Sequence, residues 1–355
     1  MRVATLTFQS ALNYGAALQA YALKEAIKEL GHECDILNYK CLAIENAYKY
    51  FPMPHSFRGV ISGVVNFSQG YSRKKVFGRF ATDCLKLGGP VNSENISERT
   101  KQYDTFIVGS DQVWNLKLTG GDNAYILDFA TGKKRVSYAA SAGHGMGDLL
   151  KSETAVEAIR LFDSISVREE DLAKHLGSTL NRDIDVVLDP VFLVDADKWR
   201  RIAQKSSLPK PYVLAYGLHE PSVYSAASTI AEKNGWNCVY VPQGRSTKCD
   251  GIKVTSPTVQ EFLGLIECAE AIVTDSFHVA AFSLLFERPL LVKLKTKYPG
   301  MNSRLTTLLE NTGAADRIIM PQDNLANLDY PAIGEHIKKL RQASMAWLEK
   351  SLNAE

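Results

Sequence analysis

The amino-acid sequence predicts an α/β protein with two Rossmann-like domains that face each other across a cleft. Three observations lead to this prediction. The chain has 355 residues, which is too long for one ordinary hydrophobic core. Short apolar segments alternate with helical segments in two successive series, as expected for parallel sheets with crossover helices. Polar residues gather directly after the predicted strands, where open parallel sheets bind their ligands.

The first series begins with a β-α-β unit. Residues 16–30 carry Leu23, Ile27 and Leu30 on one helical face, and Gly31 ends this helix. Strands are expected at residues 5–8, 33–37, 105–108, 135–138, 165–167 and 186–188. The first domain is therefore predicted to span residues 1–195.

Residues 44–87 interrupt this alternation with a segment rich in aromatic and basic side chains. We expect helical excursions beyond the sheet here. Ordinary helical packing with solvated basic residues is the preferred interpretation. The alternative is a lid, or a surface that faces a lipid-linked acceptor.

The second series predicts a C-terminal domain over residues 196–332. Strands are expected at residues 212–216, 238–241, 271–274 and 290–293. A helix over residues 222–234 ends at Gly235, and Thr258 with Glu261 forms a capping-box signature for another helix start. Residues 333–355 form a last, amphipathic helix, which we expect to pack back on the N-terminal domain.

Composition excludes several classes of protein. The chain is 45% hydrophobic and 23% charged, which is typical of a globular protein, and its net charge of +2 is too small to indicate nucleic acid as a partner. The sequence has no apolar run long enough to span a membrane, and its first residues alternate like a strand rather than a signal peptide. The six cysteines show no metal or framework spacing, so free thiols in the cytoplasm are expected, with no metal or resident cofactor.

The candidate site residues follow the predicted strands of both domains. They are Asn13, Gly15, Ser110, Asp111, Ser141, His144, Arg168, Ser276, His278, Lys293, Lys295 and Arg304. Because the carboxyl ends of parallel strands lie at one edge of a sheet, these loops are expected to line the cleft.

His278 and Arg168 are the most informative of these residues. His278 lies in the first turn of a predicted helix, where unpaired N–H groups and the helix dipole favour an anion. The alternative is that Asp275 or Ser276 caps the helix and His278 is a partly buried neighbour. Arg168 directly follows an apolar strand and is suited to hold a phosphate or carboxylate. A salt bridge to Glu169 or Glu170 is the alternative.

The remaining candidates each have a structural alternative. Of the lysines after the last strand, Lys293 and Lys295 lie nearest to the strand end. Asp111 is a candidate general base, or a residue that caps its own turn. Asn13 and Gly15 either hold a ligand phosphate or sugar hydroxyl, or form a plain turn. The sequence contains no phosphate-binding loop, zinc-protease motif or nucleophile elbow.

Taken together, these segments resemble the polysaccharide pyruvyl transferase family of bacterial surface-glycan enzymes. The matching segments are residues 13–21, 103–115, 137–141, 165–169, 187–190 and 275–278. The likeness runs in order from residue 1 to about residue 313. It implies the two-domain GT-B glycosyltransferase architecture, phosphoenolpyruvate as co-substrate, and a sugar acceptor with two neighbouring hydroxyls, in a surface polysaccharide or its lipid-linked precursor. A location at the inner face of the membrane would follow from a lipid-linked acceptor.

The resemblance also implies roles for individual residues. Arg168, in the acceptor-side N-terminal domain, would grip the donor; His278, in the donor-side C-terminal domain, would lie near its phosphate, with Lys293 or Lys295 in the next loop. Many family members carry an arginine just before this histidine motif, where the present chain has Ser276 and Phe277. Donor binding would then depend more on Arg168, Arg304 and the lysines.

Two other functions stay open at this point. A nucleotide-sugar-dependent glycosyltransferase would share the expected architecture and differ in its donor. A non-catalytic glycan-binding or assembly protein would bind the acceptor alone.

Overall fold

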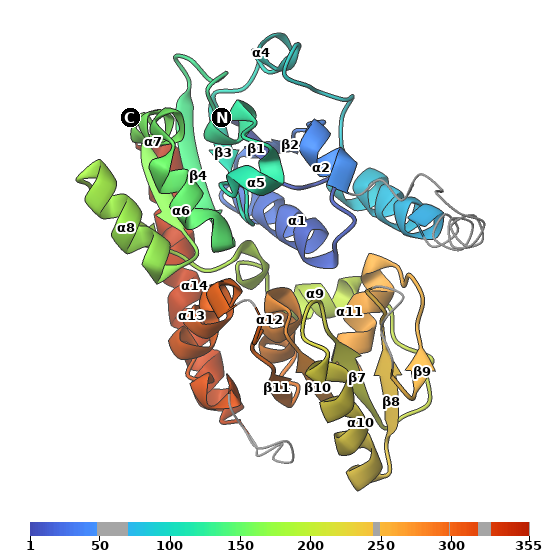
Figure 1. Ribbon diagram of the computed structural model, residues 1–355. Helices are drawn as coiled ribbons and strands as arrows, with labels where there is room; N and C mark the ends of the chain where they lie inside the picture. Colours follow the sequence, from blue (N-terminus) through green and yellow to red (C-terminus); the bar gives the residue numbers. More distant parts are fainter. Residues whose placement is uncertain (48–69, 244–248, 298, 319–327, 355) are drawn as a thin grey trace, which may run out of the picture. The chain divides into compact units, whose positions relative to one another are not determined.

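The computed structural model describes residues 1–47, 70–243, 249–297, 299–318 and 328–354. The chain divides into two compact units. Unit 1 comprises Met1–Leu193 and Ala343–Glu355, and unit 2 comprises Val194–Gln342. Each unit contains one parallel β-sheet with helices packed against it, so the predicted α/β class is confirmed (Figure 1). Among the helices that the structure describes, none combines the length and apolar character needed to cross a bilayer.

The sheet of unit 1 has six strands in the order β2-β1-β3-β4-β5-β6. The strands are β1 (Arg2–Leu6), β2 (Glu33–Ile36), β3 (Thr105–Val108), β4 (Lys134–Ala140), β5 (Ser164–Val167) and β6 (Asp185–Val186). Every neighbouring pair is parallel. Helix α1 (Tyr14–Glu29) makes the first crossover; the Asn13 side chain caps its start, and Leu30 is its C-cap residue. Because β3, β4 and β5 are parallel neighbours, their carboxyl ends lie side by side.

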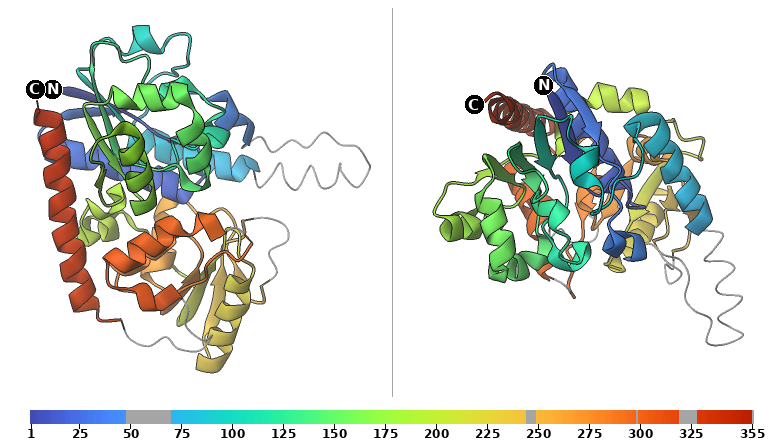
Figure 2. Two further views of the ribbon diagram at one scale, coloured as in Figure 1. Left: turned by 60° about the vertical axis from the view of Figure 1, so that its left-hand side comes forward. Right: turned by 90° about the horizontal axis from the view of Figure 1, so that it is seen from above.

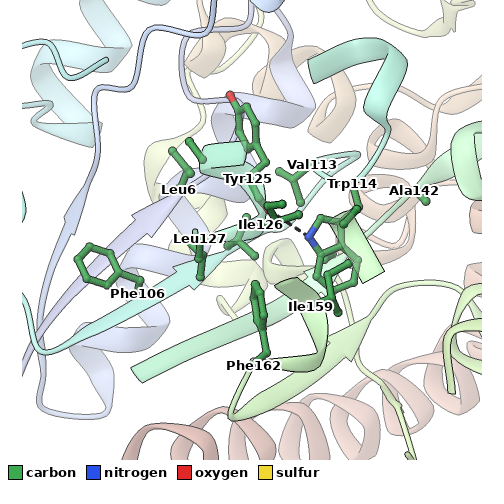
Figure 3. Packing of buried hydrophobic residues seen from close by; sticks show 14 of the residues in the cluster. Leu6, Phe106, Val113, Trp114, Tyr125, Ile126, Leu127, Ala142, Ile159 and Phe162 are labelled. Carbon is green, nitrogen blue, oxygen red and sulfur yellow. Dashed lines mark hydrogen bonds between the residues drawn. The ribbon is translucent and has the colours of Figure 1, made fainter. Parts of the chain in front are cut away.

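Both faces of this sheet are buried. One face packs against α6 (Met146–Lys151), α7 (Glu153–Arg160) and α8 (Glu170–Leu180), around a cluster that includes Leu6, Phe106 and Trp114 (Figure 3). The Trp114 ring is fully buried, and its Nε1 donates to the Tyr125 backbone oxygen at 3.1 Å. Trp114 is thus a core anchor for the loop after β3. The shorter helices of unit 1 are α2 (Leu42–Ala47), α4 (Ile96–Arg99), α5 (Leu116–Thr119), η2 (Asn123–Ile126), η3 (Gly143–Gly145) and η4 (Pro190–Phe192).

The other face of the sheet is covered by α1 and by the end of α14 (Tyr330–Asn353). Leu348 and Leu352 of α14 join Leu23 and Ile27 of α1 in one core cluster. The Ser344 hydroxyl accepts a hydrogen bond from the Leu188 N–H at 3.0 Å. The two ends of the chain consequently lie close together within unit 1, as Figure 2 shows.

The sheet of unit 2 has five parallel strands in the order β11-β10-β7-β8-β9. They are β7 (Tyr212–Tyr216), β8 (Asn237–Tyr240), β9 (Ile252–Lys253), β10 (Ala271–Thr274) and β11 (Leu290–Val292). The helices of unit 2, besides most of α14, are α9 (Ala196–Ile202), α10 (Ser222–Asn234), α11 (Val259–Glu267), α12 (Phe277–Leu285), α13 (Ser303–Asn311), η5 (Pro299–Met301) and η6 (Ala315–Ile318).

Two helical layers cover the unit 2 sheet. Helix α10 packs on one face through Val223, Ala227 and Ile230. On the other face, the ring of Phe262 in α11 lies edge-on to Tyr216 at 5.1 Å between centroids. The predicted capping box is present, since Thr258 accepts from the Glu261 N–H and the Glu261 side chain accepts from the Thr258 N–H. Helix α10 has the predicted bounds and ends at Gly235, whose φ is +67°.

The segment predicted as a helical excursion is only partly described. Residues 48–69, with most of its aromatic side chains, lie outside the described residues. Residues 70–80 are helical and continue into the π-helical turn η1 (Ala81–Leu85). Phe77 and Phe80 are buried, and their rings contact Tyr14 and Tyr21 of α1. In the described part, ordinary helical packing is therefore what the structure shows.

Candidate functional site

Three predicted site residues come together at the carboxyl edge of the unit 1 sheet. Ser110 follows β3, Ser141 follows β4 and Arg168 follows β5, and these strands are neighbours. All three residues are buried. The parallel topology thus converts three loops far apart in sequence into one cluster.

Arg168 forms a buried ion pair with Asp189. Its Nη2 lies 2.8 Å from Asp189 Oδ2 and also donates to the Ser110 hydroxyl. The Arg168 side chain is 2% exposed and that of Asp189 is fully buried. Asp189 in turn accepts the Val191 N–H at 3.0 Å, which holds the start of η4. The sequence offered Glu169 or Glu170 as salt-bridge partners of Arg168, and it did not predict the ion pair with Asp189, after β6.

Ser141 is tied to the residue that follows Arg168. Its hydroxyl donates to Glu169 Oε1 and accepts the Gly143 N–H at 3.1 Å. Glu169 is only 3% exposed. This buried pair connects the loops after β4 and β5, so Ser141 has a clear structural task in the described structure.

The loop after β3 depends on Gly109. Its φ is +117°, and a Cβ atom there would come within 2.2 Å of the Tyr138 backbone oxygen. Only glycine permits this approach of β3 to β4. Ser110, the next residue, donates its N–H to Gln19 Oε1 at 3.1 Å, and Gln19 Nε2 donates to Thr7 Oγ1 at 2.7 Å. The loop is thereby joined to α1 and to the end of β1.

The other unit 1 candidates make local contacts. Asp111 has φ +73° and its Oδ1 accepts the Gln112 N–H at 2.9 Å. Asn13 caps α1 by accepting the Ala16 N–H at 3.1 Å, and Gly15 is buried in the first turn of that helix. His144 is exposed in η3. Capping and turn chemistry, the alternatives open for Asn13 and Asp111, are present.

A second cluster lies at the carboxyl edge of the unit 2 sheet, where β7, β10 and β11 are neighbours. Asp275, directly after β10, is 1% exposed. Its carboxylate accepts the N–H groups of three successive residues after β7, at 2.6, 2.8 and 3.0 Å; the donors are Leu218, His219 and Glu220. Asp275 therefore organises the loop before α10 and does not cap α12.

His278 is the second residue of α12. Ser276 is the N-cap residue, and its side chain makes no capping hydrogen bond. Of the two capping residues that the sequence offered, Ser276 occupies the N-cap position, and it does so without a side-chain hydrogen bond. His278 is half-buried, its Nε2 is shielded from solvent, and its ring lies edge-on to that of Phe277 at 5.2 Å. A helix start without a side-chain cap keeps N–H donors and positive dipole available to an anion.

The two candidate lysines have different environments. Lys293 is half-buried directly after β11, and its backbone N–H donates to the Thr274 backbone oxygen. Lys295 is 7% exposed, and its Nζ donates to the Asp275 backbone oxygen at 3.2 Å, three residues before His278. Burial lowers the pKa of Lys295, the Asp275 carboxylate opposes this shift, and the positive charge of Arg304 reinforces it.

The loop that carries Lys295 is fixed at both of its ends. Asn302 accepts the Lys295 N–H and donates to the Lys295 oxygen, each at 3.0 Å. The N–H and hydroxyl of Thr296 donate to Glu220 Oε2 at 3.2 and 3.1 Å. Burial tends to raise the pKa of Glu220, but hydrogen bonds from Ser222 and Thr296 outweigh it and lower that pKa.

This arrangement places basic groups around one helix start. Lys295 contacts the residue before the N-cap of α12, His278 is in the first turn of α12, and Arg304 is in the first turn of α13, a helix that contacts α12. Such a combination suits a small dianion such as a phosphate ester. Among the described residues, no group of three or more His, Cys, Asp or Glu side chains is placed to bind a metal ion.

Sequence reasoning missed the acidic residues that hold these clusters. Asp189 stood before Pro190, a pattern typical of a helix start, and Asp275 followed a buried strand. Neither pattern indicates which distant groups donate to these two carboxylates. The hydrogen bonds of Gln19 to Ser110 and Thr7 could not be predicted either, because Gln19 is a buried residue of α1 and Ser110 is distant in sequence.

Comparisons with known proteins show a family and a fold. A family model described as polysaccharide pyruvyl transferase matches residues 13–292. No curated protein sequence matches the chain significantly.

Solved structures with a similar fold have low sequence identity. A putative UDP-N-acetylglucosamine 2-epimerase from Listeria monocytogenes is 12% identical, with a TM-score of 0.51 over 99% of this chain and 90% of that one. The UDP-GlcNAc 2-epimerase from Methanocaldococcus jannaschii is 14% identical, with a TM-score of 0.51 over 95% and 92%. An alpha-glucosyltransferase in complex with UDP is 11% identical, with a TM-score of 0.51 over 99% and 95%. These proteins share the GT-B fold, so the predicted two-Rossmann-domain architecture is confirmed.

Proposed function

This chain belongs to the polysaccharide pyruvyl transferase family, and we propose that it transfers the enolpyruvyl group of phosphoenolpyruvate onto two hydroxyls of a sugar. The product is a pyruvate ketal, and phosphate is released. The acceptor is a sugar of a surface polysaccharide or of its lipid-linked precursor. A lipid-linked acceptor would bring the protein to the inner face of the membrane.

One observation carries this proposal: the basic cluster at the start of α12. Phosphoenolpyruvate is a small anion with a phosphate and a carboxylate. Lys295 and Arg304 supply positive charge, His278 supplies an imidazole, and α12 supplies a helix start whose N-cap side chain, Ser276, makes no capping hydrogen bond. Lys295 is preferred over Lys293 because its side chain reaches the residue before the helix start.

The proposed reaction needs one acid and two acceptor oxygens. The His278 imidazolium delivers a proton to the methylene carbon C3, which leaves a cationic centre at C2. One sugar oxygen attacks C2 and the bond from C2 to the phosphate oxygen breaks. The second sugar oxygen then attacks C2 and closes the ketal. Of the two hydroxyl protons, one replaces the proton taken from His278 and one leaves with phosphate. Lys295 and Arg304 stabilise the leaving phosphate.

The unit 1 candidates keep their predicted roles as expectations. The family resemblance gives Arg168 to the donor, but one nitrogen of its guanidinium is already engaged by Asp189 and Ser110. We therefore assign the main neutralisation of the donor to unit 2. Asp111 remains a candidate for accepting a proton from a sugar hydroxyl.

Titration of the purified protein with phosphoenolpyruvate, beside a panel of nucleotide sugars, tests the proposal. Ligand that binds the native state raises the melting temperature in proportion to the logarithm of its concentration above Kd. We expect phosphoenolpyruvate to raise the melting temperature with this concentration dependence. UDP-sugars are included because an alpha-glucosyltransferase of the same fold binds UDP. Stabilisation by UDP-sugars alone would favour a glycosyltransferase. Stabilisation by glycans alone would favour a binding protein. Either result contradicts the proposal.

Replacement of the imidazole tests the mechanism. His278→Ala should lower phosphate release from phosphoenolpyruvate, with an acceptor that supports wild-type turnover, by about 10²- to 10⁴-fold, because a general acid contributes rate enhancements of this order. His175→Ala is the matched control, because this histidine is exposed on α8 and is not among the candidate site residues. Circular dichroism should show both variants folded. Near-normal turnover by His278→Ala would overturn the assignment.

A further inference from the structure

Two cysteines of unit 2 lie in direct contact away from the proposed donor site. Cys238 is in β8, and Cys249 lies in the connection from β8 to β9. Both are free thiols, and their Sγ atoms are 3.5 Å apart. Cys238 is 7% exposed and Cys249 is half-buried. A disulfide bond requires about 2.05 Å between the sulfurs, so a small side-chain movement would suffice to join them.

The backbone that follows Cys249 holds this contact in place. Two residues later, Gly251 passes so close to β8 that a Cβ atom there would lie 2.3 Å from the Cys238 backbone oxygen. The chain then pairs with β8 through Ile252 and Lys253. The contact is therefore built into the edge of the sheet.

The two thiols differ in a way that assigns them different chemistry. The Cys238 thiol donates to Cys249, which lowers the pKa of Cys249 to about 7, although burial and the exposed Asp250 act in the opposite direction. The Ser228 hydroxyl of α10 lies 3.9 Å from Cys249 Sγ and favours the thiolate as well. The pKa of Cys238 is raised, mainly by this shared hydrogen bond and then by burial. A half-buried thiolate beside a buried thiol has the properties of an attacking and a resolving cysteine.

We propose that Cys238 and Cys249 form a redox modification site that closes to an intramolecular disulfide with a low-molecular-weight disulfide such as oxidised glutathione. The Cys249 thiolate attacks one glutathione sulfur and expels glutathione thiolate. Cys238 then loses its proton and attacks Cys249 Sγ, which expels the second glutathione thiolate. The protein loses two electrons and one glutathione disulfide becomes two glutathiones. This site does not depend on the identity of the donor substrate.

Mass spectrometry of the full chain after incubation with oxidised glutathione tests the proposal. We expect a mass loss of about 2 Da with no lasting glutathione adduct. Arg245 and Lys248 lie between the two cysteines in the sequence, so trypsin separates them and a disulfide appears as two linked peptides. Linkage to any other cysteine, or no linkage after equilibration, would refute the site.

Variants separate the two steps. Cys238→Ser should retain glutathione on Cys249 as a stable adduct of about 305 Da, because the resolving thiol is missing. Cys249→Ser should leave Cys238 unmodified, since Cys238 is buried. Cys268→Ser is the control and should behave like the wild type. An adduct on Cys238 in Cys249→Ser, at the rate seen for Cys249, would contradict the assigned order. The wild-type peptide map decides the question even where a variant folds poorly.

Discussion

Removal of the Arg168 guanidinium should destabilise unit 1 strongly. In Arg168→Met, the Asp189 carboxylate stays fully buried but loses its ionic partner, and breaking a buried ion pair in this way costs about 3–5 kcal/mol. Asp189 keeps hydrogen bonds from the Val191 N–H at 3.0 Å and from the Ser110 hydroxyl at 3.2 Å. We therefore expect the lower end of that range, about 3 kcal/mol.

Calorimetry provides the measurement. For a unit of this size, a loss of about 3 kcal/mol lowers the melting temperature by roughly 6–12 °C. Arg160→Met is the matched control: its pair with Glu157 at 3.3 Å is exposed and its Nη1 donates to the Leu180 backbone oxygen at 3.1 Å, so its loss should cost about 1–2 kcal/mol at most. Arg168→Met combined with Asp189→Asn should lose less stability than the two single changes added together, because no charge is left unpaired.

The result that would refute this reasoning is a melting temperature of Arg168→Met no lower than that of Arg160→Met. The same two variants, titrated with phosphoenolpyruvate, separate donor binding from structural support. If Arg168 contacts the donor, as the family resemblance implies, Arg168→Met loses the stabilisation by phosphoenolpyruvate while Arg160→Met keeps it.

Two further changes test the two strand edges. Burial lowers the pKa of Lys295, so affinity for phosphoenolpyruvate, measured by titration across pH, should fall as pH rises through that lowered pKa and Lys295 loses its charge. Lys295→Arg should abolish this alkaline decline and Lys293→Arg should not; an unchanged decline in Lys295→Arg would exclude Lys295 as its source. Gly109→Ala should destabilise the protein by more than about 3 kcal/mol in urea unfolding, because its Cβ would lie 2.2 Å from a backbone oxygen. Gly132→Ala, with φ +70° and open space around it, should cost only about 1 kcal/mol, and equal costs for both would contradict the steric argument.

Local sequence pattern was sufficient to predict the elements whose cause is local. Strands β3 and β7 have the predicted bounds because each is a continuous apolar run. The capping box at Thr258 and the glycine at position 235 marked helix ends through short-range hydrogen bonding and backbone conformation. Strand β9 was missed because its two residues have no periodicity and depend on pairing with β8.

The strand edge that carries the unit 1 candidates could be predicted from the sequence, but their contacts could not. Loop position after a strand depends only on topology, so Ser110, Ser141 and Arg168 were placed at one edge correctly. Partner choice depends on which strands become neighbours. The ion pair of Arg168 with Asp189, which follows β6, therefore could not be predicted from the sequence.

The contribution of α14 to unit 1 has a consequence for how the protein is made. Leu348 and Leu352 complete a core that otherwise consists of residues from the first 193. A ribosome adds these leucines only after the whole of unit 2. During synthesis, the part of this face that α14 covers must therefore remain exposed while about 150 residues are added. In the cell, this interval is when a chaperone would be expected to bind the nascent chain.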